Sequence, residues 1–150
     1  MSIEKDINQS KFRTERQKVL INIIYSANWL NEQVKHQLDK EHITQQQFNI
    51  LRILRGAGAP ISTLQIRQRM LDKMSDTSRI VDRLVLKGLV KKNACENDKR
   101  RVDVYITAKG KKLLEKTDRY EDEMDAIAGA LSDADAKMLN RLLDKMRNSL

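Results

Sequence analysis

The chain has 150 residues, of which 40% are apolar and 33% are charged, so it can form a globular core and is not a disordered segment. Five Gly, one Pro and 4% aromatic residues argue against a β sandwich and favour a mostly helical fold. The single Cys excludes an internal disulfide framework and the usual four-ligand zinc site. No apolar run approaches the roughly 18 residues of a membrane span.

The positive charge is concentrated in one third of the chain. There are 29 Lys and Arg residues against 21 Asp and Glu residues, a net charge of +8. Residues 62–112 hold 14 basic and six acidic residues, so they carry the whole excess, and the remainder holds 15 of each. A general need for solubility would spread this charge out. Its localisation indicates a surface that binds phosphates.

The first third of the chain predicts one long helix. Residues 1–10 are polar, and we expect them to be flexible. Residues 11–40 then carry apolar side chains at steps of mostly three and four, which is the pattern of an amphipathic helix. These apolar positions are Phe12, Val19, Leu20, Ile23, Ile24, Ala27, Leu30, Val34 and Leu38, beside which Trp29 can extend the stripe.

Two short helices are expected next, because the same start signal occurs twice. Ile43–Phe48 reads as an apolar staple, a Thr cap and a Gln three residues after the cap. That helix ends at Gly56–Pro60. Ile61–Ile66 repeats the signal and predicts a helix over Ser62–Met70.

Ser75–Lys87 predicts a third short helix, with a buried stripe and an exposed polar face. Gly88 can take the left-handed conformation that ends a helix. The stripe consists of Ile80, Val81, Leu84 and Val85, and the exposed face carries Asp76, Thr77, Ser78, Arg79 and Arg83. Short hydrogen-bonding groups and guanidinium groups suit base edges and phosphates.

A hairpin follows this helix. Leu89–Cys95 and Val102–Ile106 are strand-like, and Glu96–Arg101 forms a charged turn between them with three cations, Lys99, Arg100 and Arg101. Helix, turn, helix and basic hairpin is the order of a winged helix-turn-helix. That module places a helix in the DNA major groove and the hairpin beside it.

Helices also close the chain. Thr107 caps a helix whose apolar positions run to Leu131. Ser132 starts a final helix that carries Leu139, Leu142, Leu143 and Met146 on one face. The terminal regions 11–42 and 113–150 are amphipathic, so we expect them to pair with the same regions of a second chain. The fold class is therefore mainly α with a small β wing. Residues 43–112 form the DNA-binding domain, between helical dimerisation regions.

The sequence resembles the MarR family of bacterial winged helix-turn-helix transcriptional regulators. The first part of the resemblance is Asp82-Arg83-Leu84 through Lys87-Gly88-Leu89-Val90. The second is Asp98-Lys99-Arg100-Arg101-Val102-Asp103-Val104-Tyr105-Ile106-Thr107, with Gly110 three residues on, which matches the family's wing signature. The order of elements matches from Lys11 to Leu150.

The resemblance implies a homodimer that binds double-stranded DNA. It implies that Ser75–Lys87 enters the major groove, and that Arg100 enters the minor groove with its guanidinium held by Asp98. Many family members release DNA when they bind a small anionic or phenolic effector. Others sense oxidants through a Cys in the first helix, which this chain lacks. The candidate DNA-binding residues are Ser75, Asp76, Thr77, Ser78, Arg79, Arg83, Asp98, Lys99, Arg100 and Arg101.

Several residues have an ordinary packing interpretation beside a functional one. Cys95 is expected to pack, although nearby Lys side chains could lower its pKa and give it a redox role. His36 and His42 have no ligand pattern around them, so no metal site is predicted. Phe12, Tyr25 and Trp29 fit packing better than a ligand site. Asp82 is expected to pair with an Arg rather than to read a base.

The predicted function is a sequence-specific, operator-binding regulator, expected to be a repressor and to act in the cytoplasm. Residues 1–13 lack the apolar core of a secretion signal. The alternative is a winged-helix module that uses its basic face on an acidic protein partner. An enzyme is not expected, because the sequence shows no nucleophile–base pair, metal cluster or Gly-rich phosphate loop, and no cofactor is predicted.

Overall fold

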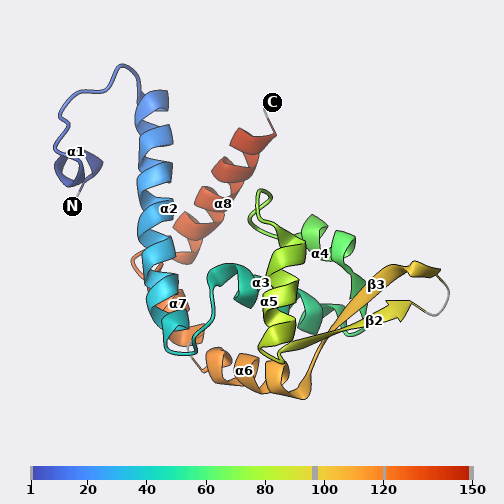
Figure 1. Ribbon diagram of the computed structural model, residues 1–150. Coiled ribbons are helices and arrows are strands. Elements are labelled where there is room, and N and C mark those ends of the chain that lie inside the picture. Colours follow the sequence, from blue (N-terminus) through green and yellow to red (C-terminus); the bar gives the residue numbers. More distant parts are fainter. Residues whose placement is uncertain (1, 96–97, 120, 149–150) are drawn as a thin grey trace. The chain divides into compact units, whose positions relative to one another are not determined.

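The structure is a computed structural model that describes residues 2–95, 98–119 and 121–148. It leaves the side chains of Cys95, Glu121, Met124 and residues 98–101 undescribed. The chain divides into two compact units, Met1–Gln45 and Gln46–Leu150. Figure 1 labels the elements. They are α1 (Ile3–Asp6), α2 (Glu15–Asp39), α3 (Gln45–Ala57), β1 (Ile61–Ser62), α4 (Thr63–Arg69), α5 (Thr77–Leu86), β2 (Val90–Cys95), β3 (Asp98–Ile106), α6 (Ala108–Asp118), α7 (Glu121–Ala126) and α8 (Asp133–Arg147).

The first unit is dominated by α2, the long predicted helix. Its N-cap is Thr14, whose hydroxyl accepts a hydrogen bond from the backbone N–H of Gln17 at 3.1 Å. Most of the apolar stripe stays exposed, and within α2 only Leu38 is buried. The exposed apolar side chains of α2 are Val19, Leu20, Ile24, Tyr25, Trp29 and Leu30.

Residues 1–10, expected to be flexible, include the one-turn helix α1. Ile3 is buried, and the carboxylate of Glu4 lies 2.5 Å from the ammonium group of Lys18 on α2. This hydrogen bond lowers the pKa of Glu4 to about 2. Apolar burial and an ion pair together explain why a polar segment takes a helical turn against α2.

The second unit has one apolar core. Side chains from α3, α4, α5, the sheet and α6 are almost fully withdrawn from solvent. In α5 the predicted stripe is confirmed for Val81 and Leu84 but is wrong for Val85, which is 37% exposed. The most deeply buried are Ile50, Leu51, Ile66, Met70, Val81, Leu84, Val90, Val104 and Leu114. By contrast, α8 has no buried residue within the single chain.

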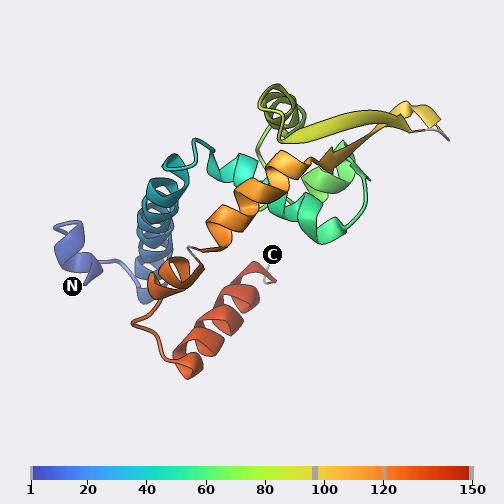
Figure 2. The same ribbon diagram turned by 90° about the horizontal axis from the view of Figure 1, so that it is seen from below.

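The sheet has three antiparallel strands in the order β1-β3-β2. Ile61 pairs with Val104, and Val90 pairs with Ile106. The sequence predicts the β2–β3 hairpin but not β1, whose two residues carry no strand pattern. In Figures 1 and 2 the yellow hairpin extends away from α5 and α6.

Two predicted boundaries are wrong. The backbone of Asp98–Arg101 belongs to β3, where a turn was expected, because β3 continues to pair with β2 as far as Asp98 opposite Cys95. The single helix expected from Thr107 to Leu131 is divided into α6 and α7. Helix α6 ends at Asp118, and Arg119 is its C-cap.

Candidate nucleic-acid interface

The start of α5 presents a polar and cationic face to solvent. Asp76 is the N-cap, and its carboxylate accepts a hydrogen bond from the backbone N–H of Arg79 at 3.1 Å. Ser78 and Arg79 are exposed on the first turn, and Arg83 is exposed one turn later. Residues four apart lie on the same helix face, so Arg79 and Arg83 form one cationic strip.

Ser75 and Thr77 do not belong to this exposed face. The Ser75 hydroxyl donates a hydrogen bond to the Asp72 carbonyl at 2.8 Å, which shapes the turn before α5. Thr77 is only 4% exposed, so the prediction that it lies on the exposed face is wrong. The reason is periodicity, since Thr77, Val81 and Leu84 follow at four and three residues and form the buried stripe of α5.

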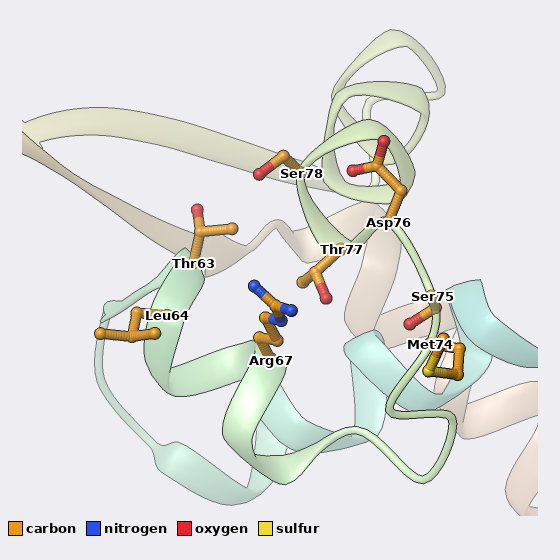
Figure 3. A pocket seen from close by; sticks show the side chains of 8 residues that line it. All are labelled: Thr63, Leu64, Arg67, Met74, Ser75, Asp76, Thr77 and Ser78. Atoms are coloured by element: carbon orange, nitrogen blue, oxygen red, sulfur yellow. The ribbon is translucent and has the colours of Figure 1, made fainter.

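A hollow of about 480 Å³ lies between α4 and the start of α5. Figure 3 shows the Arg67 side chain of α4 extending toward Thr77. No hydrogen-bond partner for the buried Thr77 hydroxyl is found among the described residues. Arg67 therefore places a further cationic side chain beside the N-terminal end of α5. Its lining residues are Thr63, Leu64, Arg67, Met74, Ser75, Asp76, Thr77 and Ser78.

An ion pair joins α5 to the wing. The Lys92 ammonium group on β2 donates a hydrogen bond to the Asp82 carboxylate on α5. Asp82 is therefore an ion-pair partner, as expected, although its partner is Lys92 and not an Arg. Its side chain is 60% exposed, so the pair links β2 to α5 but contributes little to the free energy of unfolding.

The C-terminus of α5 ends in a Schellman motif. The backbone N–H of Gly88 bonds to the Val85 carbonyl at 2.8 Å, and that of Leu89 bonds to the Leu84 carbonyl at 3.0 Å. Gly88 has a φ of +69°, as its position predicts. This ending turns the chain directly into β2, so the wing starts at a fixed point relative to α5.

Thr107 closes the far end of the wing against the same point. Its hydroxyl donates a hydrogen bond to the Gly88 carbonyl at 2.7 Å and accepts one from the Gly110 N–H at 3.1 Å. Its backbone N–H bonds to the Leu89 carbonyl at 3.1 Å. The two sequence motifs, Lys87-Gly88-Leu89 and Thr107-x-x-Gly110, therefore meet in one joint that fixes α5, the wing and α6 together.

At the wing tip, the backbone of residues 98–101 is placed in β3. The side chains of Asp98, Lys99, Arg100 and Arg101 lie outside the described residues, as does that of Cys95. The expected contact between Asp98 and Arg100 therefore stays a prediction.

Sequence reasoning missed three residues that shape this interface. Arg67 lines the hollow, Lys92 holds Asp82, and Gln47 is a buried amide whose oxygen accepts a hydrogen bond from Lys87 at 3.1 Å. For Arg67 a signal existed, because it lies one helical turn after Thr63 on the same face of α4. The other two depend on tertiary neighbours.

The described residues contain no group of three or more His, Cys, Asp and Glu side chains that could hold a metal ion. Among the same residues, no helix is both long and apolar enough to cross a membrane.

The family model for MarR matches residues 43–102, the segment that contains α4, α5 and most of the wing. FarR, an HTH-type transcriptional regulator from Neisseria gonorrhoeae, is 30% identical over 135 residues, which cover 89% of this chain and 92% of FarR. The chain belongs to the MarR family.

Two further comparisons agree with this assignment to the MarR family. PecS, an HTH-type transcriptional regulator from Dickeya dadantii, is 30% identical over 115 residues, covering 74% of this chain and 69% of PecS. The crystal structure of a mutant E. coli MarR complexed with operator DNA matches with a TM-score of 0.80 and 25% identity, over 91% of this chain and 99% of that chain. The winged helix-turn-helix fold and the role of DNA-binding transcriptional regulator are confirmed.

Proposed function

We propose that this MarR-family protein binds a pseudo-palindromic operator as a homodimer and represses transcription there. The observation that carries the proposal is the exposed strip of Ser78, Arg79 and Arg83 at the start of α5. A helix that presents its first turns to base edges in the major groove is how helix-turn-helix modules read sequence. Ser75 and Asp76 would approach the same groove from the turn before α5.

The wing is proposed to contact the adjacent minor groove. Arg100 would enter the groove, where an Arg is attracted by the enhanced negative potential of A·T-rich DNA. Asp98 would hold its guanidinium, and Lys99 and Arg101 would contact phosphates. The Asp82–Lys92 ion pair and the Thr107 joint support this assignment, because they hold the start and the end of the hairpin against α5.

The terminal helices are proposed to form the dimer interface. Large apolar side chains on α2 and α8 remain exposed in the single chain, including Ile24 at 63% and Leu142 at 51%. A second copy that covers them would also relate the two α5 helices by a two-fold axis. The expected half-sites then lie about one helical turn, roughly 10 bp, apart.

The proposal includes three further points that follow from the family role. The protein acts as a binding protein and not as an enzyme, and it acts in the cytoplasm, where its DNA is. A small-molecule effector can release the DNA, as in many regulators of this family.

Selection of bound duplexes from a random pool tests the proposal. The expected result is a pseudo-palindromic consensus whose affinity exceeds that of unrelated duplexes by roughly 10³-fold or more and falls steeply with salt. Analytical ultracentrifugation of the complex should give two chains per duplex. Equal binding of all duplexes would instead support the alternative, a module whose basic face binds an acidic protein.

A further inference from the structure

A bidentate ion pair between Arg55 and Asp118 connects α3 to the end of α6. The Arg55 guanidinium donates through Nη1 to Oδ2 of Asp118 at 2.6 Å and through Nη2 to Oδ1 at 2.9 Å. Two parallel bonds between planar groups fix their relative direction as well as their distance. A Lys in place of Arg55 could hold the distance but not the direction.

The ion pair is partly shielded and remains charged at neutral pH. The side chains of Arg55 and Asp118 are 34% and 36% exposed. The hydrogen bonds from Arg55 hold the pKa of Asp118 below its ordinary range, and the nearby charge of Arg52 acts in the same direction. The attraction between the two charges is therefore present throughout the physiological pH range.

The other end of α3 is connected to α5. Gln47, in the first turn of α3, is 4% exposed and accepts the hydrogen bond from Lys87 at the C-terminal end of α5. Helix α3 thus contacts the proposed recognition helix at one end and α6 at the other. All of these residues lie in the unit Gln46–Leu150.

The chain continues from Asp118 into α7 and α8, and α8 carries exposed apolar residues. The Thr107 joint connects α5 to the start of α6, and a second path toward this proposed dimer surface runs through α3, the Arg55–Asp118 pair and the end of α6. Any rotation of α6 on α3 would change the separation of the two α5 helices in a dimer. A change of one base pair moves a half-site by about 3.4 Å and about one tenth of a turn.

We propose that Arg55 and Asp118 are positioning residues that set the half-site spacing which this regulator accepts. The inference rests on the proposed function, because it requires a dimer that binds two half-sites. The inference goes beyond the proposed function by assigning spacing selectivity to a residue pair on α3 and α6, away from the exposed strip on α5.

The test uses the full chain and the operator obtained by selection. Three duplexes are compared: the selected operator, the same operator with one base pair inserted between half-sites, and one with a base pair removed. Wild type should lose at least about tenfold in affinity on the altered duplexes, comparable to a mismatched base pair. The Asp118→Asn variant should lose most of this difference, and its affinity for an isolated half-site should equal that of wild type.

Two variants and one control make the result specific. Arg55→Gln breaks the pair from the other side and should give the same loss of spacing selectivity. Glu115→Gln removes one negative charge from the exposed side of the same helix and should leave selectivity intact. Exchange of the two residues, Arg55→Asp with Asp118→Arg, should restore much of the selectivity that either single change removes.

The outcomes separate the two proposals. If wild type shows no sequence preference at all, the proposed function fails. If wild type discriminates spacing and both Asp118→Asn and Arg55→Gln discriminate equally well, only the positioning role is overturned. A uniform loss of affinity on all three duplexes, with the selectivity ratio unchanged, would also overturn it, because it indicates a role in stability alone.

Discussion

A Cβ atom placed on Gly110 would lie 2.3 Å from the carbonyl oxygen of Leu89. The first turn of α6 therefore lies directly against the backbone that leaves α5. Thr107 bonds to this same stretch, through its hydroxyl to the Gly88 carbonyl and through its N–H to the Leu89 carbonyl. The Thr-x-x-Gly pattern thus has a physical cause: the threonine caps α6 and binds the α5–β2 connection, and the glycine leaves room for that connection.

Replacing Gly110 by Ala should destabilise the protein by about 1–3 kcal/mol, the usual cost of overpacking a tight contact. The obstacle is backbone, namely the Leu89 carbonyl, and the Ile106 side chain lies 2.7 Å from the same Cβ position. Equilibrium urea unfolding would measure the change. Because the joint also holds the wing, operator affinity should fall as well.

Gly56→Ala is the matched control. A Cβ atom on Gly56 meets nothing within 4 Å, and the residue lies inside α3. The same substitution should be neutral or should stabilise by up to about 1 kcal/mol, because Ala loses less backbone entropy in a helix. Equal destabilisation by both substitutions would contradict the close contact at Gly110.

Signals confined to a few neighbouring residues were predictable from the sequence. The Ser62–Gln65 and Ser132–Asp135 pairs form capping boxes, and Gly88 takes a positive φ. Each depends on interactions within about four residues. The element order and the family assignment followed from such signals together with the spacing of the two motifs.

Features that depend on distant residues were not predictable. The two-residue strand β1 exists because Ile61 and Ser62 lie beside Val104 and Asp103 of β3. Asp82 of α5 pairs with Lys92 of β2, ten residues further along the chain, rather than with an Arg. The burial of Thr77 is a different case, since its spacing to Val81 and Leu84 was visible and its polar character concealed its place in the stripe.

The acid sensitivity of folding should depend on Asp118. Its folded pKa lies below the ordinary value of 3.8, so the stability it contributes is present above that value and is lost as the pH falls through the folded pKa. Asp118→Asn should therefore cost up to about 1 kcal/mol at pH 7, a value limited by solvent screening. The cost should vanish in strong acid.

Urea unfolding of wild type and Asp118→Asn at several pH values between neutrality and acid would measure how the difference in unfolding free energy depends on pH. The two curves of unfolding free energy against pH should converge toward low pH. Parallel curves would show that the Arg55–Asp118 pair does not link folding to proton binding.

A single charged substitution on α8 should dissociate the dimer. Leu142 is 51% exposed in one chain, and under the dimer proposal it becomes buried against a second copy, where an unpaired carboxylate is costly. Leu142→Glu should therefore sediment as a monomer at concentrations at which wild type is a dimer. Operator affinity should fall with it, since a monomer contacts one half-site.

Leu86→Glu controls for the same chemical change. Leu86 is 86% exposed at the last residue of α5, outside the terminal helices. Its substitution should leave the sedimenting species a dimer. A monomer in this control, or a dimer in Leu142→Glu, would count against the assigned interface.

Arg100→Ala tests the wing. Loss of one minor-groove guanidinium should weaken operator binding by about 1–3 kcal/mol and reduce the slope of log affinity against log salt by about one. Folding should be unchanged, because residue 100 belongs to the first part of β3, seven residues before the Thr107 joint. Fluorescence anisotropy at several salt concentrations would measure both effects, with Arg119→Ala as a control that removes the same charge from the exposed end of α6.

The same variant distinguishes groove reading from simple charge. If Arg100 enters an A·T-rich minor groove, replacing the A·T pairs under the wing by G·C pairs should weaken wild type much more than Arg100→Ala. A phosphate contact would instead lower the affinity of Arg100→Ala equally for both duplexes. If wild type and variant were equally sensitive to this replacement, Arg100 would not enter the minor groove, and α5 alone would read the sequence.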